Sequence, residues 1–183
     1  MKKILFTTSC FILFLITNAQ TIVLKVDGMK GESDKAKFKD KTELLGFVME
    51  GAVLQSTSTA GGMSAGKRSY QPITILKQTG AISPLLFQNF YLNKHIREVV
   101  VEYYKTDNAY VTGKTGAEVL DYTVTFKNVK IIGFKQFAGP LKNERFDPVN
   151  NNALCDEIKF NFQEIILDYK KAGTIAQDNI MPR

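Results

Sequence analysis

The stretch Tyr122-Thr123-Val124-Thr125-Phe126-Lys127 decides the fold class of this chain. Every second residue from Tyr122 to Phe126 is apolar, and a period of two places these side chains on one face of a strand. After Asn128 the apolar positions change phase to Val129 and Ile131. The phase change predicts a bulge or a tight bend near Asn128, within an otherwise half-buried strand.

The same alternation extends outward along the chain in both directions. The other predicted strands are Ile22–Asp27, a bent or bulged strand within Glu43–Leu54, Tyr70–Lys77, the stretch around Val99–Tyr103, and a final long strand from Ile158 to about Tyr169. The residues beyond Lys171 show little pattern. Several antiparallel strands with little helix predict an all-β fold, either a compact antiparallel β-barrel or a two-sheet sandwich.

One short helix interrupts the strands, at Ser83–Asn93. Ser83 is a favourable N-cap residue, and Pro84 suits the first helical turn. Leu86, Phe87 and Phe90 share one face at helical spacing. We expect that face to pack against the sheet and to close one side of the barrel.

The N-terminus resembles a secretory signal peptide. Lys2 and Lys3 precede an apolar run, Ile4–Ile16, which ends at the small-x-small sequence Thr17-Asn18-Ala19. The apolar run is too short to span a membrane comfortably. We therefore expect cleavage after Ala19, a secreted or periplasmic protein, and no membrane anchor after cleavage.

Length and composition predict one mature domain at residues 20–171, followed by a tail at 172–183. The net charge is +6, two units of which belong to the signal lysines, and no dense basic run predicts a nucleic-acid partner. Of the two cysteines, only Cys155 would remain after processing. No intrachain disulfide is then possible, so stability must come from the core or from oligomerisation.

The stretch Gly61-Gly62-Met63-Ser64-Ala65-Gly66-Lys67-Arg68-Ser69 nearly matches a phosphate-binding loop. However, Arg68 stands where the loop needs the Ser or Thr hydroxyl that binds Mg²⁺. The residues that follow, Tyr70–Leu76, are typical of a strand, whereas a phosphate loop leads into a helix N-terminus. We interpret the stretch as a flexible interaction loop and predict no bound nucleotide or other cofactor.

The chain offers few groups for catalysis. His95 is the single histidine, and its place just after the helix favours a hydrogen-bonding linker role. Cys155 is followed by Asp156 and Glu157, whose charges raise a thiol's pKa and so make it a poor nucleophile. We predict no catalytic site.

Asp27, Glu32 and Asp34 could offer oxygen atoms to Ca²⁺, but their spacing does not match an EF-hand loop. We interpret them as solvated acids of a turn. One histidine and one mature cysteine also fall short of a usual zinc ligand set. No metal site is predicted.

Four stretches in order resemble the Hcp family, the haemolysin-coregulated proteins that build the inner tube of type VI secretion systems. They are Ile22–Ser33, Thr59–Leu76, the helix from Ser83 to Ile96, and Glu157–Tyr169. The resemblance covers roughly Thr21–Lys170, with insertions around 108–118 and 140–152.

The resemblance implies a compact two-sheet β-barrel with one helix, assembled into hexameric rings that stack into a tube without catalysis of its own. It implies as partners other copies of the chain, secretion-system components and small effector proteins. It also implies that the glycine-rich loop contacts a neighbouring protomer or ring. The loop residues are Gly61, Gly62, Ser64, Gly66, Lys67 and Arg68. A secreted monomeric β-barrel that binds a ligand or a surface partner is the alternative.

Overall fold

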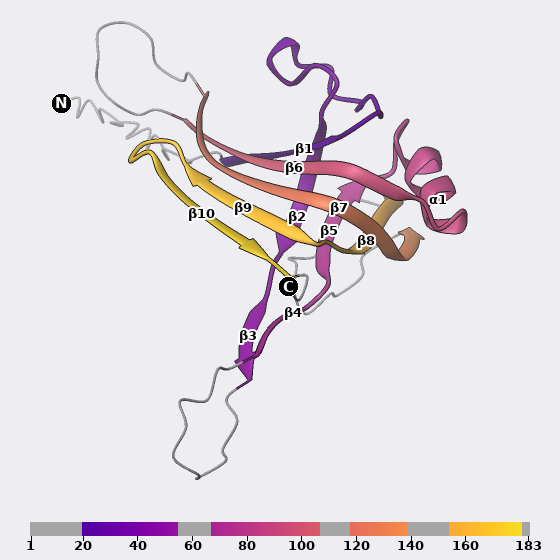
Figure 1. Cartoon of the computed structure of the whole chain (residues 1–183). Helices are drawn as coiled ribbons and strands as arrows, with labels where there is room; N and C mark the ends of the chain where they lie inside the picture. Colours follow the sequence, from indigo (N-terminus) through magenta and orange to yellow (C-terminus); the bar gives the residue numbers. More distant parts are fainter. Residues whose placement is uncertain (1–19, 55–66, 107–117, 139–153, 181–183) are drawn as a thin grey trace, which may run out of the picture.

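The computed structural model describes residues 20–54, 67–106, 118–138 and 154–180 (Figure 1). The elements in chain order are β1 (Gln20–Val26), a 3-10 turn η1 (Ala36–Phe38), β2 (Thr42–Val48), β3 (Gly51–Leu54), β4 (Lys67–Tyr70), β5 (Ile73–Gln78), α1 (Ser83–Tyr91), β6 (His95–Thr106), β7 (Glu118–Ala138), β8 (Leu154–Asn161), β9 (Glu164–Tyr169) and β10 (Thr174–Asn179). The predicted all-β fold with one short α-helix is confirmed.

Six strands close into a barrel. They are hydrogen-bonded in the order β7-β6-β1-β2-β5-β8, and β8 pairs back with β7, so that the sheet has no edge along this circuit. All of these pairings are antiparallel. The β9–β10 hairpin extends the sheet from β7, and β3 with β4 forms a separate ribbon that leads away from the barrel (Figure 1). The barrel is therefore the observed form of the predicted fold.

Strand β7 holds the barrel together because its two halves have different neighbours. Its first half pairs with β6 and β9, and its second half, from Lys130 onward, pairs with β8. Asn128 lies where the partner of β7 changes from β9 to β8, and it has a φ of 50°. The pairing with β6 keeps its register there, since Glu98 faces Lys127 and Ile96 faces Val129. The predicted irregularity therefore appears as a positive φ at Asn128, and the pairing of β7 with β8 shifts register shortly afterwards, between Ile131 and Gly133.

The barrel interior is filled by the apolar faces that the alternation predicts. Val124 and Phe126 are buried before the bend, and Val129 and Ile131 are buried after it. They pack with side chains from the other barrel strands, among them Leu24, Ile75, Val101, Ile158 and Phe160. A second, smaller cluster of Val23, Phe38 and Tyr104 buries the outer face of β1 beneath η1.

Two predicted strands are each divided in the structure. The Glu43–Leu54 stretch forms β2 and β3, and β2 is irregular between Leu44 and Gly46. The stretch from Ile158 to Tyr169 forms β8, which belongs to the barrel, and β9, which pairs with the other edge of β7. The residues after Lys171, in which the sequence shows no pattern, include β10 paired with β9.

The helix lies where it was predicted, with two differences. The prediction that Ser83 is its N-cap is wrong, because Ile82 holds that position and its side chain makes no capping hydrogen bond. Leu86 is buried and Phe90 is partly buried against the core, as expected. Phe87, which was expected to face the sheet as well, is half exposed.

Candidate functional site

The predicted interface loop is connected to the barrel by the β3–β4 ribbon. Lys67 and Arg68 are the first two residues of β4, and their backbones pair with Leu54 and Val53 of β3. The other four loop residues, Gly61, Gly62, Ser64 and Gly66, lie outside the described residues. A projecting two-stranded arm, β3 with β4, thus leads to the loop. The contact role of the six loop residues stays a prediction.

The base of this arm is fixed to the body of the protein. The hydroxyl of Tyr70 donates a hydrogen bond to Asp178 Oδ2 of β10 at 2.8 Å, and its ring lies edge-on to Phe162, with the centroids 5.5 Å apart. The backbone N–H of Gln71 donates to Glu50 O at 3.0 Å. These contacts hold the direction in which the arm leaves the barrel.

The backbone around Lys67 agrees with the interpretation that this is not a phosphate site. Lys67 begins strand β4, whereas the lysine of a phosphate-binding loop opens a helix whose N-terminal N–H groups bind the phosphate. Helix α1 begins only at Ser83, after β4 and β5. The arrangement that the phosphate loop requires does not occur at this lysine.

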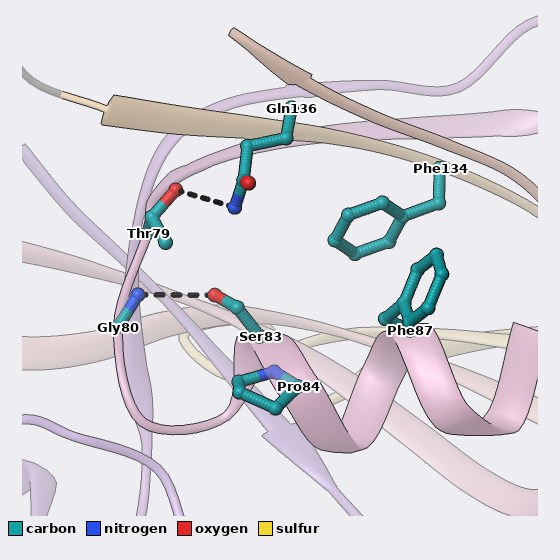
Figure 2. Close-up of a pocket in the computed structure, with 7 residues that line it drawn as sticks. All are labelled: Thr79, Gly80, Ser83, Pro84, Phe87, Phe134 and Gln136. Carbon is teal, nitrogen blue, oxygen red and sulfur yellow. Dashed lines mark hydrogen bonds between the residues drawn. The ribbon is translucent and has the colours of Figure 1, made fainter. Parts of the chain in front are cut away.

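A pocket lies at the N-terminal end of α1, between the helix, the end of β5 and strand β7 (Figure 2). Its volume is about 500 Å³. Its walls are formed by Thr79, Gly80, Ser83, Pro84, Phe87, Phe134 and Gln136. Local sequence patterns do not reveal this pocket, because its residues come from two distant stretches of the chain, 79–87 and 134–136.

A buried ion pair lies behind the pocket wall. Lys77 and Asp156 are direct partners in the β5–β8 pairing, and both side chains are fully buried, with their N and O atoms 3.6 Å apart. Lys77 Nζ is also 3.0 Å from Glu32 Oε1 and donates to Ser83 Oγ at 2.9 Å. A buried lysine thus has two carboxylates and a hydroxyl as partners.

Asp156 connects this ion pair to the pocket wall. Its carboxylate accepts hydrogen bonds from Thr79 Oγ1 at 2.7 Å, from Gln136 Nε2 at 3.0 Å, and from Ser83 Oγ. Burial pushes the pKa of Asp156 upward, but these hydrogen bonds and the charge of Lys77 outweigh it and hold the pKa below its usual value. The carboxylate therefore stays ionised and orients the polar residues of the wall.

Glu32 reaches the same cluster from the loop after β1. Its Oε2 accepts a hydrogen bond from the backbone N–H of Ile82 at 2.9 Å, at the start of α1. This approach requires glycine at position 80, because a Cβ there would lie 2.6 Å from the Glu32 carboxylate carbon. The prediction that Glu32 is a solvated acid is wrong, and Asp27 is paired as well, through two hydrogen bonds from Arg97.

The two residues considered for catalysis have no nucleophilic arrangement. Cys155 is buried, and its pKa is raised by burial first and then by the charge of Asp156, as its neighbours predicted. His95 is exposed at the first residue of β6, and it makes no side-chain hydrogen bond within the described residues, so the linker role is not observed. Across those residues no group of three or more His, Cys, Asp or Glu side chains is placed to hold a metal ion.

In the described part of the chain, none of the helices is long and apolar enough to cross a membrane. The predicted signal peptide, residues 1–19, lies outside the described residues.

The sequence matches the protein family described as "Type VI secretion system effector, Hcp" over residues 23–169. This range runs from within β1 to the end of β9 and therefore includes every barrel strand. No curated protein sequence matches the chain.

Solved structures share the fold at low sequence identity. Hcp1 from E. coli EAEC 042 is 19% identical, with a TM-score of 0.65 over 88% of this chain and 98% of that one. A type VI secretion system effector from Yersinia pestis is 23% identical, with a TM-score of 0.61 over 86% and 98%. The secreted protein Hcp3 from Pseudomonas aeruginosa is 14% identical, with a TM-score of 0.63 over 90% and 99%.

Proposed function

The chain belongs to the Hcp family of type VI secretion proteins, and on this premise we propose that it is an exported structural protein whose copies assemble into hexameric rings. The observation that carries the proposal is the family match over the whole barrel, from β1 to β9. In this role the protein is a tube component, or a derivative of one, and performs no catalysis. Its partners are other copies of itself, components of the secretion system and small effector proteins.

The outer face of α1 supports a role in contacts between subunits. The helix carries no charged residue, and Leu85, Phe87, Tyr91 and the adjacent Leu92 are all exposed large apolar or aromatic side chains. Four such residues within eight positions form a concentrated apolar surface, and contact surfaces are typically depleted of charge and enriched in aromatic residues. A neighbouring subunit would remove this surface from water.

The β3–β4 arm supports a second contact, through the loop from Gly61 to Arg68. The arm projects from the barrel and is fixed at its base, so a loop at its end can reach a neighbouring protomer or ring (Figure 1). In this proposal the glycines let the loop fit the neighbour, and Lys67 and Arg68 supply charge for its acidic groups.

Export through the signal peptide is part of the same proposal. Cleavage after Ala19 would leave all of β1 in the mature chain, because β1 begins at Gln20. N-terminal sequencing of the protein recovered outside the cytoplasm tests this directly. A mature chain that begins at Met1 would contradict it.

The first prediction concerns assembly. A ring buries surface only in the associated state, so its melting temperature should rise with protein concentration. Analytical ultracentrifugation of the mature protein should show a mass several times that of the protomer, and the sixfold mass is expected. A monomeric mass together with a melting temperature independent of concentration would favour the monomeric binding module instead.

The second prediction concerns the loop. Gly66→Val should fold with an unchanged strand-rich circular dichroism spectrum, because the barrel core is not altered. The branched side chain stiffens the loop, so association between subunits or rings should weaken about tenfold, or about 1.4 kcal/mol. Sedimentation at several protein concentrations measures the change.

Replacing Lys67 and Arg68 together with alanine should weaken the same contact mainly at low salt, where charge pairs between subunits are least screened. Lys25 and Lys30, which are exposed elsewhere on the protein, provide the matched double-alanine control. Parent-like sedimentation of both loop variants would show that the loop is not the contact element.

A further inference from the structure

From the pocket at the start of α1, we infer a binding site for a neutral aromatic group that carries one hydrogen-bond donor, such as a phenol or an indole. The site is separate from the arm, and the inference does not depend on ring assembly. Its volume of about 500 Å³ falls within the range of about 300–1,000 Å³ that is usual for small-molecule pockets.

The aromatic preference comes from two phenyl rings in the pocket wall. Phe87 of α1 and Phe134 of β7 lie edge-to-face, with their centroids 5.4 Å apart (Figure 2). Phe87 is 50% exposed although it is a large apolar side chain. A third ring in the pocket would cover the exposed part of Phe87 and add the favourable geometry of an aromatic contact.

The preference for a neutral group comes from the charges around the pocket. None of its seven lining residues is charged. The nearest ionic groups are Lys77, Asp156 and Glu32, which are already paired with one another. A charged ligand would lose its hydration in this pocket without gaining an ionic partner, whereas a neutral ring has no such cost.

The need for a donor comes from the fixed orientation of Gln136. A carboxylate can only accept hydrogen bonds, so the amide nitrogen of Gln136 must face Asp156 Oδ1, at 3.0 Å. The same nitrogen lies 3.4 Å from Thr79 Oγ1. The amide oxygen accepts no hydrogen bond from the described residues, and Figure 2 shows the amide between Thr79 and the two phenyl rings. The pocket therefore offers a pre-oriented acceptor beside an aromatic wall.

Indole is a suitable probe, because the chain contains no tryptophan and indole fluorescence has no tryptophan background. Titration of the mature protein, diluted so that protomers predominate, with indole should show saturable binding with a Kd of about 1 mM or lower, as expected for so small a ligand. 1-Methylindole, which lacks the donor, should bind about threefold to tenfold more weakly, the usual effect of losing one hydrogen bond. Absence of saturable indole binding at about 10 mM, or equal binding of the two ligands, would overturn the assignment.

Two variants locate the bound ring. Phe87→Ala should fold, because Phe87 is half exposed, and it should weaken indole binding about threefold to tenfold. Tyr91→Ala, on the same helix but outside the pocket, is the matched control and should bind like the parent. Binding unchanged by Phe87→Ala would place indole elsewhere and contradict the proposal.

Gln136→Leu tests the acceptor. Indole and 1-methylindole should bind this variant equally, because the amide oxygen is gone. Retained discrimination would show that another group accepts the hydrogen bond. Should Gln136→Leu fail to fold, the comparison of the two ligands on the unmodified protein still decides whether the donor is used.

The aromatic group could belong to a free molecule or to a side chain of a neighbouring copy, which can supply a tyrosine but no tryptophan. Titration with p-cresol, the analogue of a tyrosine side chain, distinguishes the two sources. Binding to dilute protomers that is lost in the assembled protein assigns the pocket to a neighbouring tyrosine. Equal binding to both forms assigns it to a ligand from outside the assembly.

Discussion

Replacing Asp156 with alanine is expected to lower the free energy of unfolding by about 3–5 kcal/mol, the usual cost of removing one partner of a buried ion pair. Lys77 is fully buried, and it would keep only Glu32 as a carboxylate partner. Thr79, Ser83 and Gln136 would also lose the acceptor that they share. Urea unfolding at low protein concentration, where association contributes least, measures the loss.

A double-mutant cycle separates the ion pair from the hydrogen bonds. Lys77→Met should also destabilise the protein. The loss of unfolding free energy in the Lys77→Met/Asp156→Ala double variant should be smaller than the sum of the two single losses, because the double variant removes both members of the pair and leaves neither one without the other. Strictly additive losses would show that the two groups do not interact across the β5–β8 pairing.

The pH dependence gives a second measurement of the same carboxylate, with Asp156→Asn as the comparison. The pKa of Asp156 is lowered in the folded state, so its contribution to stability is complete above the unfolded value near 3.8 and is lost as pH falls through the lower folded value. The free energy of unfolding of the parent should therefore be larger than that of Asp156→Asn at neutral pH. The two values should approach each other below about pH 4. A constant difference across this range would contradict the lowered pKa.

The sequence predicts the barrel well because the strands carry local signals. Alternation identifies β1 and β7, and the change of phase after Asn128 coincides with the positive φ at which β7 exchanges one neighbour for another. The break between β8 and β9 could not be predicted in this way. Phe160, Phe162 and Ile165 are all buried, so the apolar pattern continues while the chain changes partners.

The pocket and its ion pair could not be predicted from local patterns. Lys77 follows a run of apolar residues in β5, where a lysine is expected to reach solvent, and it is buried because the pairing with β8 places Asp156 opposite it. Ser83 has the sequence features of a helix cap, but its hydroxyl bonds Asp156 instead. Each of these interactions joins residues that are distant in the chain, and sequence patterns report only on neighbours.

The second large effect is expected at Phe126, the residue from which the fold class was first inferred. It is fully buried, and in β7 it pairs with Val99 of β6 on one side and Ile165 of β9 on the other. Its ring contacts Phe160 and Phe162, with centroid separations of 5.4 and 4.9 Å. The side chain therefore joins the closed barrel to the β9–β10 hairpin.

Phe126→Ala is expected to lower the free energy of unfolding by about 3–5 kcal/mol, because it removes a buried ring and leaves a cavity. The three strands around it, β6, β7 and β9, are held in one sheet and cannot move inward to fill it. For a chain of this size that loss corresponds to a fall in melting temperature on the order of 10 °C. Phe87→Ala is the matched control: it removes the same ring from a half-exposed position and should cost about 1 kcal/mol or less. Calorimetry of both variants at equal concentration makes the comparison. Equal losses would mean that the Phe126 ring is no more important to the fold than a surface phenylalanine, and that the junction of β6, β7 and β9 is not the centre of the core.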